Sequence, residues 1–245
     1  MTTLVLAAHG SRDPRFAATV ERISEGVRDR LGDTDVRLAY LDLNTPTVSE
    51  VLASESLATR SGEILLAPLL LSEAFHSKID LPALVDQACR DNPTLTVRQL
   101  PTLGGDPRII TALADRLDQV GLRPTDGVLM TAVGSTDAAA DDAVRARAAD
   151  LALDLGTPLV ELVFATRLGD ADSAVRDAIG NLRRQGARRI VVSPYFLSAG
   201  LLTERVDTAV DKLAPGAQIA GPLGAHPALI DVVCDRYRAA LPVHA

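Results

Sequence analysis

The sequence carries one pattern twice, and this internal duplication restricts the folds open to the chain. Residues 4–11 (LVLAAHGS) recur as residues 128–135 (VLMTAVGS), and residues 67–76 (APLLLSEAFH) recur as residues 193–202 (SPYFLSAGLL). The halves align at an offset of about 124 residues. The stretch 121–126 has the composition of a turn, so we predict two lobes, 1–122 and 123–245.

Strand and helix patterns alternate along both halves. Apolar runs predict strands near residues 3–8, 36–41, 63–71 and 95–100, and helical periodicity predicts helices near 14–31, 46–59, 78–90 and 106–120. The second half repeats this order, with strands near 127–132, 159–165, 189–197 and 217–222 and helices near 137–155, 170–186, 202–213 and 226–240. Continuously apolar strands are typical of parallel sheets buried on both faces. We therefore predict an α/β fold of two similar lobes, each a parallel sheet flanked by helices.

Composition narrows the class of protein. The formal net charge of −7 argues against a general binder of nucleic acid or of anionic membranes. No apolar run approaches the length of a membrane span, and no signal peptide is recognised. The two cysteines have no metal-binding spacing. We expect a soluble cytoplasmic protein. The sequence has no GxGxxG, Walker A, GxSxG or HExxH motif. A dinucleotide-binding protein, a nucleotide-binding protein and a common hydrolase are therefore not our first choices.

Candidate chemistry is confined to the first half. His9, Asp42 and His76 each follow a predicted strand, whereas the equivalent residues of the second half are Val133, Thr166 and Leu202. The carboxyl ends of parallel strands form one edge, where α/β folds bind ligands. Two imidazoles and a carboxylate suit a borderline divalent metal such as Fe(II) or Co(II). In the alternative reading, each histidine is a hydrogen-bonded structural residue at a strand end.

The loop after His9 contains a candidate anion site. Gly10 allows a tight turn, and the backbone N–H groups near Ser11 precede a helix, where they favour an anion. Arg12 would add a charge-assisted hydrogen bond to a carboxylate, and Thr136 replaces it in the second half. Alternatively, Ser11 caps the following helix, and the two roles are compatible.

Two other polar residues receive weaker assignments. Glu73 lies three residues before His76 and corresponds to Ala199 in the second half. It is either a proton shuttle or partner of the histidine, or a solvated loop residue. His226 aligns with Asp106, which predicts a helix cap or a loop hydrogen bond for both.

The two histidine segments carry a family resemblance. Residues 7–12 (AAHGSR) and 69–82 (LLLSEAFHSKIDLP) resemble the CbiX/SirB family of sirohydrochlorin chelatases, over essentially the whole chain and in the two-repeat form. The resemblance implies a class II chelatase fold of two chelatase-like lobes, and an enzyme that inserts Fe(II) into sirohydrochlorin to make siroheme. Co(II) insertion for cobalamin biosynthesis and a non-catalytic tetrapyrrole or metal carrier remain the alternatives.

The resemblance also implies roles for individual residues. His9 and His76 fall on the family's metal-binding and catalytic histidines, and Asp42 falls where the family often has Glu. We expect His9, His76 and Glu73 to be catalytic, and Gly10, Ser11, Arg12 and Asp42 to bind the substrate. No nucleotide is expected, and the chain lacks the cysteine cluster of iron–sulfur members. Two fused copies favour a monomer.

Overall fold

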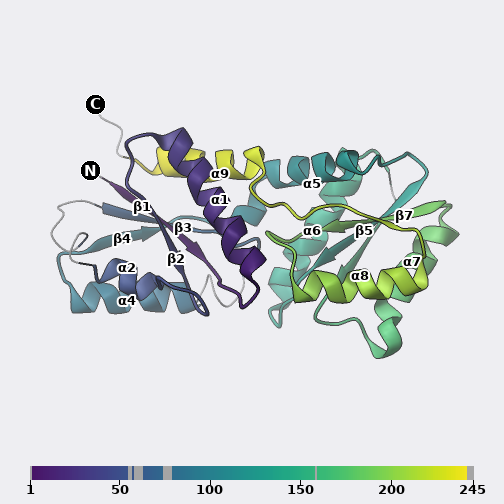
Figure 1. Cartoon of the computed structure of the whole chain (residues 1–245), viewed down its shortest axis with the longest axis horizontal. Coiled ribbons are helices and arrows are strands. Elements are labelled where there is room, and N and C mark those ends of the chain that lie inside the picture. The colour runs from purple at the N-terminus through teal and green to yellow at the C-terminus, as the bar shows by residue number, and fades with distance from the viewer. Residues whose placement is uncertain (1, 55–56, 58–62, 74–78, 158, 242–245) are drawn as a thin grey trace. The chain divides into compact units, whose positions relative to one another are not determined.

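The computed structural model describes residues 2–54, 57, 63–73, 79–157 and 159–241. Within these residues the chain forms two four-stranded parallel sheets, each flanked by helices on both faces (Figure 1). The predicted α/β fold of two similar lobes is therefore confirmed. Among the described residues, no helix has both the length and the apolar character needed to cross a membrane.

The two sheets have equivalent strand orders. The first contains β1 (Thr3–Ala8), β2 (Val36–Tyr40), β3 (Glu63–Pro68) and β4 (Thr96–Gln99) in the order β2-β1-β3-β4. The second contains β5 (Asp126–Ala132), β6 (Val160–Phe164), β7 (Arg189–Pro194) and β8 (Gln218–Ile219) in the order β6-β5-β7-β8. All strand pairs are parallel, as the apolar runs predicted.

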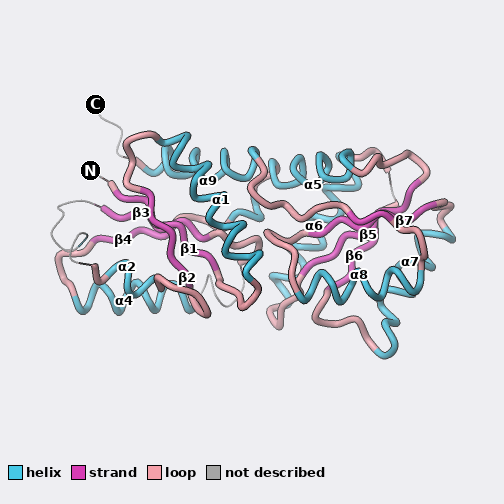
Figure 2. Tube along the Cα trace, in the orientation of Figure 1, coloured by secondary structure: helices cyan, strands magenta, loops and turns pink. Residues whose placement is uncertain are grey.

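Helices connect the strands in both repeats (Figure 2). Their bounds are α1 (Pro14–Leu31), α2 (Val48–Leu52), α4 (Leu81–Asp91), α5 (Arg108–Gln119), α6 (Ala138–Asp154), α7 (Ser173–Arg184), α8 (Leu201–Leu213) and α9 (Pro227–Ala240), with 3-10 turns at Leu103–Gly105 and Asp170–Asp172. Most of these bounds lie within three residues of the expected ranges. The helix expected at 46–59 is shorter, and part of that range lies outside the described residues.

The contacts divide the chain into two compact units that differ from the two repeats by one element. Unit 1 consists of residues 1–106 and 225–245, and unit 2 of residues 107–224. Helix α5 ends the first repeat but packs in unit 2 against α6, and α9 ends the second repeat but packs in unit 1 against α1. The sequence placed the division between residues 122 and 123, whereas the folded units divide after residues 106 and 224 because each contains the last helix of the other repeat.

The exchange follows from the need to cover both faces of each sheet. In unit 1, α2 and α4 cover one face over a core that includes Val5, Leu66 and Leu52. The other face is covered by α1 together with α9, whose side chains Val232 and Val233 are fully buried. Without α9, apolar surface of β3 and α1 would be exposed to water. This exposure would cost about 25 cal/mol of free energy for each Å².

Polar contacts fix α9 in unit 1. Arg236 donates to the carbonyl of Pro101 at 2.7 Å, and Arg30 pairs with Asp231 at 2.8 Å. The helices α1 and α9 approach closely at Gly26, where an added Cβ would lie 2.5 Å from Ile230 Cδ1. The exchanged helix is therefore positioned by both packing and hydrogen bonds.

A half-buried carboxyl on α8, that of Asp207, makes the free energy of unfolding depend on pH. Burial, with a contribution from the nearby Glu204, raises the pKa of Asp207 to about 6. Between about pH 4 and pH 6 the unfolded chain loses this proton while the folded chain retains it, so the stabilisation present at low pH is lost as the pH rises. We expect Asp207→Asn to raise the free energy of unfolding by about 1–2 kcal/mol near pH 7.5 and to change it little near pH 4.

Urea unfolding at the two pH values measures this difference. Asp211→Asn, which removes an exposed carboxylate from the same helix, is the matched control and should have little effect at either pH. An equal gain from Asp207→Asn at both pH values would contradict the assignment.

Candidate active site

The ends of β1 and β2 place His9 beside Asp42. The parallel ladder continues past both strands, because Leu41 N–H donates to the Ala8 carbonyl at 2.8 Å and Asp42 N–H donates to the His9 carbonyl at 3.0 Å. Asp42 is exposed, and its carboxylate accepts the Leu43 N–H at 2.7 Å. The expected convergence of these two residues at the carboxyl edge of the first sheet is therefore observed.

Gly10 makes this arrangement possible. Its φ of +99° lies in the region that favours glycine, and a Cβ at this position would come within 1.7 Å of the Asp42 carbonyl oxygen. Gly134 in the second repeat has φ +88°, and its Cβ would meet Thr166 Oγ1 at 2.7 Å. Both repeats thus require a backbone without a side chain where the first strand turns toward its helix.

Asn44, which the sequence analysis missed, fixes the backbone of the loop directly after Gly10. The Ser11 N–H donates to Asn44 Oδ1 at 2.7 Å, so this amide already has a partner within the loop. The Ser11 hydroxyl accepts the Asp13 N–H at 3.1 Å, and Asp13 itself caps α1 by accepting the Arg15 N–H. The suggestion that Ser11 caps the helix is therefore wrong. The signal for Asn44 was its position in a turn directly after a strand.

The second repeat builds the same turn with different side chains. Ser135 N–H donates to Asp141 Oδ1 at 2.8 Å, and Asp141 lies on α6 instead of in the strand-end loop. The buried Asp141 carboxylate is paired with Arg167, which also donates to the Ser135 carbonyl at 2.6 Å. The turn is retained in both repeats although the residue that supports it has changed.

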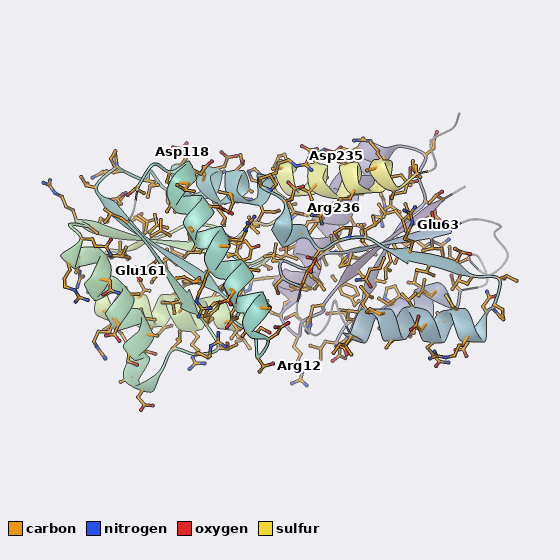
Figure 3. The ribbon with its side chains drawn as sticks, turned by 180° about the vertical axis from the view of Figure 1, so that it is seen from behind. Arg12, Glu63, Asp118, Glu161, Asp235 and Arg236 are labelled. Atoms are coloured by element: carbon orange, nitrogen blue, oxygen red, sulfur yellow. The ribbon has the colours of Figure 1, made fainter. Side chains whose placement is uncertain are left out.

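Arg12 and Arg15 follow each other closely but differ in their contacts. Arg15 pairs with Asp13 at 2.6 Å, and this hydrogen-bonded guanidinium, with the Arg15 N–H, lowers the pKa of Asp13 to about 2. The Arg12 side chain is exposed at the loop (Figure 3), and no hydrogen bond joins it to another described residue. Arg12 therefore has a guanidinium available for an anionic ligand.

The remaining predicted site residues have mixed outcomes. Glu73 is exposed after β3, but His76 lies outside the described residues, so its position relative to His9 stays a prediction. Across the part of the chain that the structure describes, no three His, Cys, Asp or Glu side chains form a metal-binding group. His226 caps α9 by accepting the Ala228 N–H at 3.2 Å, which confirms its predicted structural role.

The second repeat has neither an imidazole nor a carboxylate at the two positions equivalent to His9 and Asp42. Val133 stands at the His9 position and is 45% exposed, and Thr166 donates its hydroxyl to the Val133 carbonyl at 2.7 Å.

The CbiX family model matches residues 3–120 and, a second time, residues 127–240. The chain belongs to the CbiX family.

Several relatives of this CbiX protein match nearly all of its length. It is 25% identical to a sirohydrochlorin ferrochelatase of Priestia megaterium, over 98% of this chain and 91% of the relative. It is also 25% identical to a sirohydrochlorin cobaltochelatase of the same organism, over 96% of this chain and 79% of the relative. SirB from Bacillus subtilis, solved with Fe3+, shares the fold at a TM-score of 0.83 and 21% identity, covering 97% of this chain and 94% of SirB.

Because Gly10 lies so close to the Asp42 carbonyl, adding a single methyl group at Gly10 should strongly lower the stability of the protein. Gly10→Ala must displace the strand-end loops that carry His9 and Asp42, and we expect the free energy of unfolding to fall by about 3 kcal/mol or more. Gly32→Ala is the matched control, because Gly32 also has positive φ (+59°) but nothing lies within 4 Å of its added Cβ. Its strained backbone alone (φ +59°, ψ −119°) should cost about 1–3 kcal/mol, which is less than strain and close contact together. Urea unfolding of both variants tests the difference, and equal losses would show that the contact with Asp42 is unimportant.

Proposed function

We propose that this CbiX protein is a sirohydrochlorin chelatase that inserts Fe(II) into sirohydrochlorin to form siroheme. The observation that carries the proposal is the CbiX family match across both repeats. Full-length relatives named as sirohydrochlorin chelatases support the same reaction. The position of His9 beside Asp42 at the carboxyl edge of the first sheet supports placing the site in unit 1.

The chemistry of metal insertion sets two tasks for the protein. Two pyrrolic N–H protons must leave the macrocycle, and the metal must exchange its bound water for macrocycle nitrogens. A neutral imidazole is both a metal ligand and a proton acceptor that functions near neutral pH. In our proposal His9 and His76 hold the incoming metal beside the macrocycle and accept the protons as it transfers.

The other predicted site residues have supporting roles in this proposal. Gly10 and Ser11 shape the loop that orients His9. Arg12 binds a peripheral carboxylate of sirohydrochlorin through a charge-assisted hydrogen bond. Asp42 accepts a hydrogen bond from substrate or metal-bound water, and Glu73 relays protons from His76 toward solvent. Because the Ser11 N–H is engaged by Asn44, the substrate contact is assigned to the Arg12 side chain.

Cobalt insertion is the alternative reaction of the same site. Fe(II) and Co(II) both accept imidazole ligands, and the two Priestia megaterium relatives, one named for each metal, have equal identity to this chain. The proposal has the protein act as a cytoplasmic monomer, with the substrate metal as its sole metal and with no nucleotide or iron–sulfur cluster.

An anaerobic absorbance time course tests the reaction. The protein is mixed with sirohydrochlorin and either Fe(II) or Co(II), and insertion is followed in the visible spectrum. We expect the wild type to accelerate insertion, and His9→Ala and His76→Ala each to lower the rate by at least about 100-fold, because each removes a metal ligand and proton acceptor. The ratio of the two metal-dependent rates identifies the preferred metal.

The control variant removes an imidazole elsewhere. His226→Asn keeps a good acceptor at the N-cap of α9 and should retain the wild-type rate. If wild type and both histidine variants match the uncatalysed rate, the enzyme assignment fails, and stoichiometric macrocycle binding would then favour a carrier.

Substrate affinity provides a separate test of Arg12. We expect Arg12→Ala to raise the KM for sirohydrochlorin about tenfold with little change in kcat, as loss of a charge-assisted hydrogen bond of about 1.5 kcal/mol predicts. Arg15→Ala removes a cation three residues away that is already paired with Asp13, so its KM should stay near the wild-type value. An equal rise in both variants would indicate a general charge effect.

A further inference from the structure

A groove in unit 2 lies apart from every residue assigned to the proposed reaction. It has a volume of about 430 Å³ and runs between helix α6 and strand β6. This volume falls at the small end of the range for ligand sites. Its lining residues are Arg145, Ala148, Ala149 and Ala152 from α6, and Val160, Glu161, Leu162 and Phe164 from β6. Glu161, labelled in Figure 3, marks the strand.

The strand that borders the groove is an unpaired edge. β6 is the outermost strand of its sheet, and Leu159 and Ala165 direct their backbone groups to β5. Because alternate residues of a parallel strand bond to opposite sides, Val160 and Leu162 point their N–H and C=O groups outward. In the described part of the chain, no hydrogen bond reaches these outward groups. Such an edge is a template for an added strand.

The first repeat covers the equivalent edge with its own chain. At the edge of β2, Arg28 donates from Nε to the Val36 carbonyl at 3.1 Å. Tyr40 donates to the Pro46 carbonyl at 3.0 Å and forms an isolated parallel bridge with Thr47. An extended segment therefore already pairs with this edge in one copy of the fold.

Arg28, which bonds to the edge strand of the first copy, and two neighbouring residues of α1 are replaced by alanine in the second. At the offset of 124 residues, Arg28 corresponds to Ala152, and Ser24 and Glu25 correspond to Ala148 and Ala149. These replacements leave the groove open above Val160 and Leu162. The same scaffold thus has a covered edge in unit 1 and an uncovered one in unit 2.

Two arginines, each paired with a carboxylate of α6, lie at one end of the groove. Arg145 replaces Glu21 of the first repeat, and its guanidinium lies 5.2 Å from the centroid of the Phe164 ring. Arg167 lies over the same ring at 4.7 Å. Arg145 is 56% exposed, and its ion pair with Asp142 at 3.3 Å is open to solvent. The exposed Arg145 guanidinium can therefore exchange Asp142 for another anionic group beside the carboxyl end of β6.

We propose that this groove binds the C-terminal end of an extended apolar peptide. The peptide backbone adds a parallel strand to β6 by pairing with Val160 and Leu162. Its apolar side chains rest on the three alanines of α6, and its terminal carboxylate pairs with Arg145. Strand addition supplies affinity through main-chain hydrogen bonds, and the groove and the cation supply selectivity.

A peptide pool and backbone NMR test the proposal on the full chain. The probe is a pool of acetylated apolar pentapeptides that end in Val, Leu or Ile with a free carboxyl group. We expect the amide resonances of Val160 and Leu162 to shift on titration, because strand addition gives these groups new partners. The same pool with amidated ends should bind about tenfold more weakly, since it lacks the charge that pairs with Arg145.

A variant taken from the first repeat closes the groove. Ala152→Arg introduces the residue that occupies the equivalent position 28, where it is accommodated against the edge strand. We expect it to weaken peptide binding by at least about tenfold. Ala146→Arg adds the same charge at an exposed position of α6 outside the groove and should leave binding unchanged.

Three outcomes would overturn the proposal. The first is the absence of shifts at Val160 and Leu162 at millimolar peptide. The second is equal binding by wild type and Ala152→Arg. The third is equally tight binding of hexanoate, which has the carboxylate and an apolar chain but no peptide backbone, because it would identify a site for small carboxylates.

Discussion

The contact between Gly10 and the Asp42 carbonyl determines how the chain leaves the first sheet. A Cβ at Gly10 would lie 1.7 Å from that oxygen, so the loops after β1 and β2 touch through backbone alone. This close approach brings His9 and Asp42 to one edge and leaves Asn44 within reach of the Ser11 amide. The second repeat keeps the glycine and the turn but has no imidazole there, which separates the requirements of the fold from those of the chemistry.

Local sequence patterns predicted the strands and helices well, because apolar period and capping residues act within a few positions of one another. Helix α1 has the expected bounds, although its cap is Asp13 and not Ser11. Partners distant in the sequence were not predictable. Asn44 and Asp141 support equivalent turns from different elements, so the repeat alignment itself concealed them. The helix exchange was also hidden, since α5 and α9 have the same amphipathic pattern whichever sheet they cover. The partnership of His76 with His9 remains a prediction.

The two repeats have diverged in opposite ways at two places. At the carboxyl edge, the first repeat holds His9 and Asp42, whereas the second holds Val133 and Thr166. At the outer edge strand, the first repeat is covered by Arg28 and by residues 46–47, whereas the second exposes β6 beside three alanines. Duplication supplies two copies of one scaffold, and a given task needs only one of the two copies. Changes that would destroy a site in one repeat are neutral in the other.

The helix exchange has a consequence for the order in which the protein is completed during synthesis. Unit 2 is one continuous segment, residues 107–224, and contains all of its covering helices. Unit 1 begins first but needs α9, whose last residue is Ala240. On a ribosome, unit 2 therefore has its whole sequence available while unit 1 still exposes one apolar face. The unit that carries His9 is therefore the last for which the whole sequence becomes available.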